Sequence, residues 1–326
     1  MKLLIILFAY LLPTSLWAID IHTFKTEYVD LLQVNGKVLG LDVNGTAHSL
    51  ELNSSELSGD YYVLPEKSHQ PDDILPDGLV VVGKGMIKKA WLGGPTDRYN
   101  HGVMLDNIEA TRLYADVGDE KPVFFELKSN WVFEDRFPRL VDFDNDGQDE
   151  LVVIRTDIDS GASIAVYGLN QGRLILEAAS DTIGLSHRWL NIIGIEDFDG
   201  DGIKEIAAVI TPHIGGDLTL FRQRENQLVP VSTDSGYSNH EYGSRELGMS
   251  ASLDFNHDGV MDMAVPDARR RDLILLTFTE NQLVQYTEIE NNAGIKSGIY
   301  VAELDGDALP ELVYLLKDNT LKVIDF

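Results

Sequence analysis

The sequence predicts an all-β fold, and more narrowly a β-propeller of six four-stranded blades, with seven blades as the alternative. Four segments repeat one acidic pattern, and their starts lie 55, 57 and 49 residues apart. Short apolar runs bounded by Gly, Asp and Asn flank each repeat, which is typical of strands. No segment keeps a helical apolar period over three turns. Four strands in roughly 50 residues are the repeating unit of a propeller.

The first repeat shows how these strands are expected to follow one another. The run 151–154 follows the acidic segment directly, and 163–167 and 173–176 come next, separated by a turn at 170–172. The corresponding runs in the later repeats are 206–210, 218–221 and 228–231; 263–265, 273–278 and 283–286; and 312–316 and 321–326. Runs before the acidic segments, such as 190–195 and 298–301, supply the remaining strand of each unit.

The last repeat ends one strand short, so we expect the N-terminal segment 20–32 to supply that strand and close the ring, which would hide its edges. Counting backwards, 98–136 is expected to form a blade without an acidic loop, and 34–91 a looser first blade. A seventh blade would lie within 54–94. No change of composition marks a linker, so 19–326 is expected to be a single domain.

Residues 1–18 have the pattern of a secretory signal peptide. Lys2 precedes the apolar run 3–12, and Ala18 is the expected cleavage position. An uncleaved anchor is the alternative, although the run is about half of the ~20 residues that span a bilayer. We therefore expect an exported bacterial protein, periplasmic or secreted, with no membrane span in its mature form.

Charge and cysteine content exclude several classes of function. The chain has 26 Lys and Arg against 53 Asp and Glu, a net charge of −27, and no cysteine. Disulfides, thiolate metal sites and cysteine nucleophiles are thereby excluded. Nucleic acid is not an expected partner, because binding to phosphate backbones depends on clustered Lys and Arg. Bound metal is then a plausible means of stiffening the loops of an exported chain.

The acidic repeats predict calcium sites, because neighbouring carboxylates repel one another unless a cation neutralises them. Each loop offers side-chain oxygens at positions 1, 3, 5 and 9 and a backbone carbonyl at position 7, with a glycine at position 6 for the turn. Such a flexible set of oxygen ligands suits Ca²⁺ better than Mg²⁺. The ligands predicted for the first three loops are Asp142, Asp144, Asp146, Gln148 and Glu150; Asp197, Asp199, Asp201, Ile203 and Glu205; and Asp254, Asn256, Asp258, Val260 and Asp262. Acidic turns without metal are the alternative.

An EF-hand is excluded, since its twelfth loop position must be a bidentate Glu, and here that position holds Val153, Ala208 and Val265. The fourth loop departs from the pattern. Its candidate ligands are Glu303, Asp305, Asp307 and Glu311. Ala308 replaces the turn glycine, which penalises a left-handed backbone. The sequence leaves calcium at this loop open.

The motif Asp-x-Asp-x-Asp-Gly-x-x-Glu followed by an apolar strand resembles the FG-GAP/VCBS repeats of integrin-α-like β-propellers. The resemblance covers 137–326 well. It implies Ca²⁺ in hairpin loops between the first and second strands of individual blades. It implies no particular activity, since such propellers serve adhesion, glycan binding, scaffolding and occasionally lyase chemistry. Phe143, Phe198, Phe255 and Leu304 within the loops are expected to point inward between blades.

The face opposite the acidic loops is the candidate ligand site. If the acidic turns join strands 1 and 2, the other connections lie at the opposite end and carry basic and aromatic residues. These suit an anionic or carbohydrate ligand; polar loops without a ligand are the alternative. The candidate residues are Arg98, Tyr99, His101, His187, Arg188, Trp189, His213, His240, Tyr242 and Arg245.

Linear enzyme motifs are absent: the chain has no Gly-x-Ser-x-Gly, no His-Glu-x-x-His and no phosphate-binding glycine loop. We assign no catalytic residue and expect a non-enzymatic binding, adhesion or scaffold module for a protein or glycan. The alternative is a carbohydrate-active lyase or hydrolase. Its sign would be His and Arg around one cavity together with a perturbed pair of carboxylates.

Overall fold

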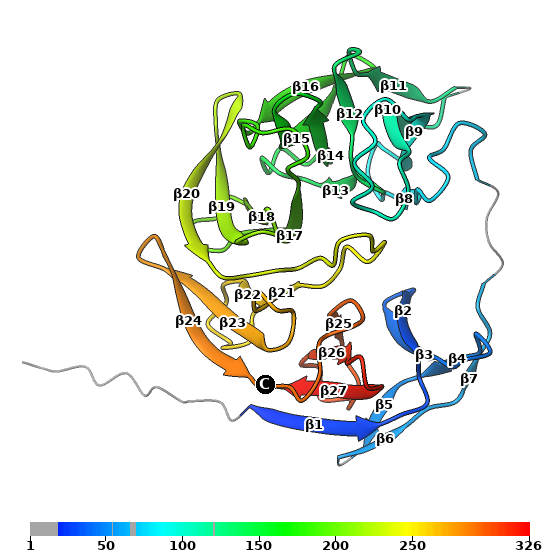
Figure 1. Cartoon of the computed structure of the whole chain (residues 1–326), viewed down its shortest axis with the longest axis vertical. Helices are drawn as coiled ribbons and strands as arrows, with labels where there is room; N and C mark the ends of the chain where they lie inside the picture. The colour runs from blue at the N-terminus through cyan, green and yellow to red at the C-terminus, as the bar shows by residue number, and fades with distance from the viewer. Residues whose placement is uncertain (1–18, 54, 66–69, 120) are drawn as a thin grey trace, which may run out of the picture.

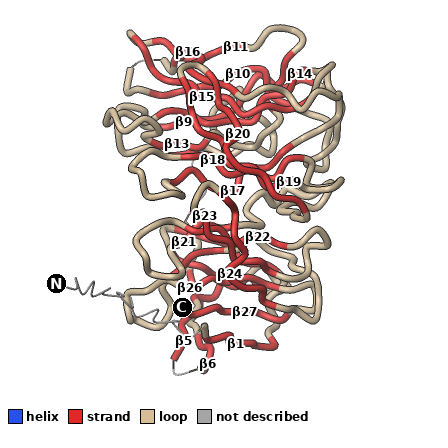
Figure 2. Tube along the Cα trace, turned by 90° about the vertical axis from the view of Figure 1, so that its left-hand side faces the viewer, coloured by secondary structure: helices blue, strands red, loops and turns tan. Residues whose placement is uncertain are grey.

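The computed structural model describes residues 19–53, 55–65, 70–119 and 121–326, and every regular element within them is a β-strand. Figure 2 shows strands and loops alone in this part of the chain. The predicted all-β class is confirmed. The predicted signal peptide, 1–18, lies outside the described residues. Within the described residues, no helix has the length and apolar character needed to cross a membrane.

Most strands form six four-stranded antiparallel units, within which strands that are neighbours in sequence pair with one another, except for β4 with β7 and β27 with β1 (Figure 1). The first unit contains β2 (Asp30–Val34), β3 (Lys37–Leu41), β4 (Ala47–Ser49) and β7 (Tyr61–Tyr62), and the second contains β8 (Val81–Val82), β9 (Lys89–Thr96), β10 (Glu109–Asp116) and β11 (Val123–Glu126). The third contains β13 (Arg139–Val141), β14 (Glu150–Asp157), β15 (Gly161–Asn170) and β16 (Arg173–Ala179), and the fourth contains β17 (Leu190–Glu196), β18 (Glu205–Ile210), β19 (Asp217–Arg224) and β20 (Gln227–Ser235). The fifth contains β21 (Ala251–Leu253), β22 (Asp262–Pro266), β23 (Leu273–Thr279) and β24 (Gln282–Ile289), and the sixth contains β25 (Tyr300–Ala302), β26 (Glu311–Leu315), β27 (Thr320–Asp325) and β1 (Asp20–Lys25).

Three further strands lie outside these units. β5 (Glu51–Asn53) and β6 (Glu56–Ser58) form a separate hairpin, and β12 (Trp131–Phe133) pairs with both β10 and β14. A single parallel bridge, Ala179 to Gln227, joins β16 to β20. Through β12 and this bridge, the second, third and fourth units form one continuous sheet of thirteen strands.

The N-terminal strand completes the last unit, as predicted. β1 pairs with β27 from Asp20–Asp325 to Lys25–Thr320, and Figure 1 shows the two strands side by side although they lie at opposite ends of the sequence. The predicted boundaries of the first two units were wrong. The first unit occupies 30–62, and Trp91 lies on β9 in the second. The apolar pattern of β9 is interrupted by Gly93, Gly94 and Pro95, so this strand could not be recognised from the sequence.

The described strands do not form a seventh unit. Within the described parts of 54–94, the strands β6, β7, β8 and β9 belong to three different sheets. They pair with the first unit, with the second unit, or with β5. This stretch therefore adds no further four-stranded unit in the described residues.

The core lies in layers between successive units, and β14 shows why the predicted strands are continuous apolar runs. Leu151 and Val153 pack into the layer shared with the second unit, whereas Val152 and Ile154 pack into the layer shared with the fourth. Successive side chains of a strand point to opposite faces, so a strand with a layer on each side is buried on both.

Five such layers join units two to three, three to four, four to five, five to six, and six to one. The apolar residue at the second position of each acidic loop fills the layer toward the next unit, as predicted. These residues are Phe143, Phe198, Phe255 and Leu304. No hydrophobic cluster of described residues joins the first unit to the second.

Candidate functional site

The four acidic loops, 142–150, 197–205, 254–262 and 303–311, each join the first and second strands of a unit, as predicted. Their backbones share one scaffold, because the amide at position 5 donates to the side chain at position 3. The four pairs are Asp146–Asp144 (3.1 Å), Asp201–Asp199 (3.1 Å), Asp258–Asn256 (2.9 Å) and Asp307–Asp305 (3.0 Å). Equal geometry in four loops follows from equal residue spacing.

The sixth position takes the left-handed backbone that the glycines predicted. Gly147, Gly202 and Gly259 have φ between 85° and 88°, and Ala308 keeps the same conformation at 73°. For a residue with a Cβ this conformation costs about 1 kcal/mol. The fourth loop therefore keeps the shape of the others despite its alanine.

The carboxylates at position 9 are buried. Glu150 is 5% exposed, Glu205 0%, Asp262 2% and Glu311 0%. Glu150, Glu205 and Glu311 accept the amide of loop position 2, at 2.8, 3.1 and 2.8 Å. Burial raises the pKa of Glu150 and Glu311 to about 7 and that of Asp262 to about 8. A buried carboxylate without a full set of partners is destabilising, so these groups favour a cation nearby.

In three of the four loops the acidic side chains gather donor atoms that fit a hard cation, whereas the described carboxylates of the third loop, 254–262, do not form such a group. Ligand oxygens lie within 4.8 Å of one another in Asp142, Asp144 and Asp146; in Asp197, Asp199 and Glu205; and in Glu303, Asp305, Asp307 and Glu311. Three buried oxygens have no hydrogen-bond partner: Asp142 Oδ1, Asp262 Oδ2 and Glu311 Oε1. Because all of these donors are oxygens, the groups can hold a metal ion of the class that includes Ca²⁺.

A cavity of about 280 Å³ lies among loops that leave the opposite ends of the strands. We call it the histidine cavity, and its lining residues are His101, His187, Arg188, Trp189, Thr211, His213, Ile214 and Tyr242. They come from the connections β9–β10, β16–β17, β18–β19 and β20–β21. Six of the ten candidate ligand residues thus line one cavity; Thr211 and Ile214 carried no distinguishing pattern in the sequence.

Two further candidates support the lining from behind. The Tyr99 ring stacks on His187 with centroids 4.9 Å apart, and the Tyr99 hydroxyl accepts the His187 amide at 2.7 Å. His240 is fully buried and packs on Trp189 at 4.7 Å. Trp189 in turn stacks on His213 at 6.1 Å. The rings of the cavity are therefore fixed by packing before any ligand binds.

A buried carboxylate orients one of the lining histidines. His101 Nδ1 lies 2.5 Å from Glu134 Oε1, and Glu134 is 1% exposed. The other Glu134 oxygen accepts the Thr156 hydroxyl at 2.8 Å, and Trp189 Nε1 donates to the Glu134 carbonyl at 2.9 Å. Because the carboxylate only accepts, Nδ1 carries the hydrogen of this contact, which fixes the orientation of the ring and leaves Nε2 for a ligand.

Glu109 is a second buried carboxylate beside this pair. It is 4% exposed, its Oε2 has no hydrogen-bond partner, and its Oε1 accepts the His101 amide at 3.4 Å. Burial raises the pKa of Glu109 to about 7. Neither Glu109 nor Glu134 carries a signal in the sequence, because only strand pairing places them beside His101.

Hydrogen-bond partners fix the tautomers of the two other lining histidines. His240 Nε2 donates to the Ser244 carbonyl at 3.0 Å, so neutral His240 accepts at Nδ1 from His213 Nε2 at 2.8 Å. The Ser186 hydroxyl donates to a carbonyl and therefore accepts from His187 Nδ1 at 2.9 Å. His213 Nδ1 and neutral His187 Nε2 remain as acceptors.

Burial lowers the pKa of His213 to about 3 and that of His240 to about 4, so both are neutral at pH 7. Because the unfolded chain takes up these protons near pH 6.5, folding stability should fall as the pH drops below that value. For fully buried His240 the loss by pH 5 is about 2 kcal/mol. We expect this loss to be smaller in a His213→Gln, His240→Gln variant.

Urea unfolding at pH 7 and pH 5 measures this effect as a difference between the two proteins. The comparison removes the contribution of all other titrating groups, including the buried carboxylates whose raised pKa acts in the opposite direction. An equal stability change in both proteins would contradict the assignment of neutral histidines.

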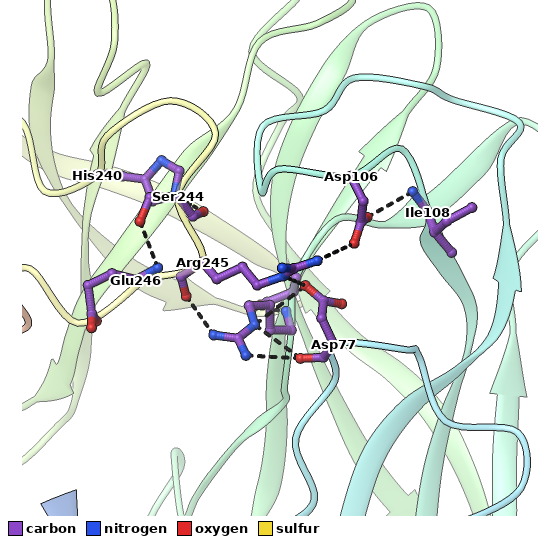
Figure 3. A network of polar contacts seen from close by, with 9 residues as sticks. Asp77, Asp106, Ile108, His240, Ser244, Arg245 and Glu246 are labelled. Carbon is purple, nitrogen blue, oxygen red and sulfur yellow. Dashed lines mark hydrogen bonds and ion pairs between the residues drawn. The ribbon is translucent and has the colours of Figure 1, made fainter. Parts of the chain in front are cut away.

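Arg98 and Arg245, the remaining two candidates, do not line the cavity. Arg98 donates to the carbonyls of Lys128 and Trp131. Figure 3 shows Arg245 between two carboxylates, with Nε 3.1 Å from Asp77 Oδ2 and Nη2 2.8 Å from Asp106 Oδ2. Both arginines therefore serve as structural contacts rather than as free cations.

Backbone conformation also marks the cavity. Thr211 has a φ of 50° and His187 a φ of 55°, both in the left-handed region. This conformation is uncommon for a residue with a side chain, and it is most unfavourable for a β-branched residue such as Thr211. Thirteen other non-glycine residues of the described chain share this region, so the conformation of Thr211 is the feature particular to the cavity.

No family model matches the chain, and no curated protein matches it. Among solved structures, it is similar to the crystal structure described as BBS1N in complex with ARL6DN, soaked with mercury. That match has a TM-score of 0.36 and 10% sequence identity, and it covers 94% of this chain and 95% of the other. At these values the match adds nothing to the fold and site described above.

Proposed function

We propose that this chain is an exported, calcium-binding β-propeller that acts as a binding module for a glycan, and that it belongs with the FG-GAP/VCBS-repeat proteins. Six four-stranded units in sequence, with β1 completing the sixth, support a propeller of six blades. The N-terminal pattern 1–18 supports export to the periplasm or the exterior.

The observation that carries the binding function is the convergence of residues from four separate loops on the histidine cavity. His101 and Tyr242 are 141 positions apart, yet the Tyr242 hydroxyl donates to the His101 carbonyl at 2.8 Å. A cavity of about 280 Å³ is slightly smaller than the ~300 to 1,000 Å³ of small-molecule sites. It has room for a sugar residue rather than for a large cofactor.

The chemistry of the lining favours a hydroxyl-rich ligand. Neutral His213 presents an acceptor nitrogen, and the second ring nitrogens of His101 and His187 also bond hydroxyl groups, which both donate and accept. Tyr242 is 57% exposed and offers its ring to the apolar face of a sugar. Arg188, which is half-buried and donates one hydrogen bond to the His187 carbonyl, suits a carboxylate or sulfate substituent. A glycan supplies all of these features together.

We expect Tyr242→Ala to weaken glycan binding about tenfold or more, because an aromatic contact contributes on the order of 1 to 2 kcal/mol. An oligosaccharide array identifies the best-bound probe, and calorimetry with that probe measures the loss. Tyr61→Ala is the matched control, since Tyr61 is 69% exposed on β7 and lies outside the cavity. Equal affinity of the two variants, or no array binding above background, would contradict the proposal.

A carbohydrate-active enzyme is the second candidate function, and the paired His101 and Glu134 beside protonatable Glu109 favour it. Such a pair can hold a proton acceptor at His101 Nε2 next to a bound sugar. Incubation with polysaccharides, followed by chromatography of the products, tests for cleavage. Products that disappear in His101→Gln would favour the enzyme, whereas binding without products would favour the binding module.

A further inference from the structure

One acidic loop already contains a cation of the protein's own. In the second loop Arg222 Nε donates to Glu205 Oε1 at 2.8 Å, and its Nη2 lies 2.6 Å from the same oxygen. Nη2 also contacts Asp199, and Nη1 lies 3.8 Å from Asp201. The guanidinium thus engages the carboxylates at loop positions 3, 5 and 9, which are three of the predicted calcium ligands.

Strand pairing explains why only this loop has such a partner. Ile206 on β18 pairs with Phe221 on β19, and the two strands are antiparallel. The residue before Ile206, which is Glu205, therefore lies opposite the residue after Phe221, which is Arg222. In the third, fifth and sixth units the same register position holds Gly168, Thr277 and Asp325. None of these carries a positive charge, and Asp325 adds a negative one.

The buried oxygens without hydrogen-bond partners also distinguish the second loop from the other three. They are Asp142 Oδ1 in the first loop, Asp262 Oδ2 in the third and Glu311 Oε1 in the fourth, where Asp262 and Glu311 are at least 98% buried. None of these described buried atoms belongs to the second loop, because Arg222 satisfies Glu205. An unpaired buried acceptor is costly, so three loops need a cation from solution and one does not.

We propose that Arg222 is the built-in cation of the second acidic loop, so that the chain binds calcium in the first, third and fourth loops only. The inference rests on the proposed calcium binding and specifies where it occurs. For calcium to enter the second loop, Arg222 would have to leave three carboxylates at once. Charge-assisted hydrogen bonds between a guanidinium and buried carboxylates are about twice as strong as neutral ones, so the internal cation competes with calcium for this loop.

Native mass spectrometry of the purified chain in calcium counts the bound ions. We expect three ions in the original chain and four in Arg222→Thr, which has the residue of the fifth unit at this position. Arg224→Thr is the matched control, since Arg224 is exposed near the end of the same strand, and it should keep three. Four ions in the original chain, or three in folded Arg222→Thr, would overturn the proposal.

A second pair of variants tests the assignment without changing Arg222. Asp197→Asn should leave the count at three, whereas Asp142→Asn, at the same position of the first loop, should lower it to two. Loss of an ion in Asp197→Asn would overturn the proposal while leaving calcium binding intact. If neither the original chain nor any variant binds calcium, calcium binding itself is wrong and this inference fails with it.

Discussion

Calcium should raise the melting temperature of the chain by roughly 10 °C relative to a chelator, and Mg²⁺ should not. Each site at ten times its Kd contributes about 1.4 kcal/mol, because calcium binds the folded loops and not the unfolded chain. Three sites then add about 4 kcal/mol, and a chain of this size gains roughly 2 to 3 °C per kcal/mol. Thermal unfolding followed by circular dichroism gives the shift directly.

The combined change Asp144→Ala, Asp258→Ala, Asp307→Ala removes one ligand from each of the three loops and should abolish the calcium shift. The control Glu56→Ala, Asp72→Ala, Glu290→Ala changes the charge equally at exposed positions outside the loops. This control should keep the full shift. An equal response of both triple variants to calcium would show that the stabilisation comes from general charge screening and not from the loops.

Replacing Asp77 by alanine should destabilise the fold by about 3 kcal/mol, because its carboxylate lies between two arginines and is almost fully buried. The Asp77 side chain is 9% exposed, and its Oδ2 lies 3.1 Å from Arg245 Nε and 3.6 Å from Arg136 Nε. Arg136 also donates to the Asp77 and Arg245 carbonyls. These contacts join three segments far apart in sequence, as Figure 3 shows for Asp77 and Arg245.

Urea unfolding of Asp77→Ala, Arg245→Ala and the double variant separates this interaction from other effects of truncation. We expect the double variant to lose clearly less than the sum of the two single variants. Asp72→Ala is the control, since Asp72 is exposed five residues away and should change stability by about 0.5 kcal/mol or less. Strict additivity, or a loss for Asp77→Ala no larger than for Asp72→Ala, would contradict the role given to this network.

The strands and acidic loops could be predicted because their signals are local. An apolar run such as 151–154 immediately after alternating carboxylates needs no long-range information, and the structure places it in β14. β9 escaped prediction because Gly93, Gly94 and Pro95 break its pattern. The partner of the last repeat could be expected from the missing strand alone, and the β1–β27 pairing confirms it.

The candidate site could be predicted only in part, because its details depend on register and packing. Alternating hairpins place His101, His187 and Tyr242 at the same end of the strands, so their gathering followed from topology. The contact between His101 and Glu134 depends on how β12 and β14 pair, which the sequence does not reveal. Arg222 reaches its loop for the same kind of reason, since only the pairing of β18 with β19 sets it opposite Glu205.

Anomalous diffraction from crystals of the chain grown in calcium tests the central claim most directly, because it locates each ion among the carboxylates. We predict six four-stranded blades around one axis, with anomalous peaks in the loops 142–150, 254–262 and 303–311 and none beside Arg222. Well-ordered acidic loops without any peak would contradict calcium binding. An arrangement of the six units other than a ring would contradict the propeller.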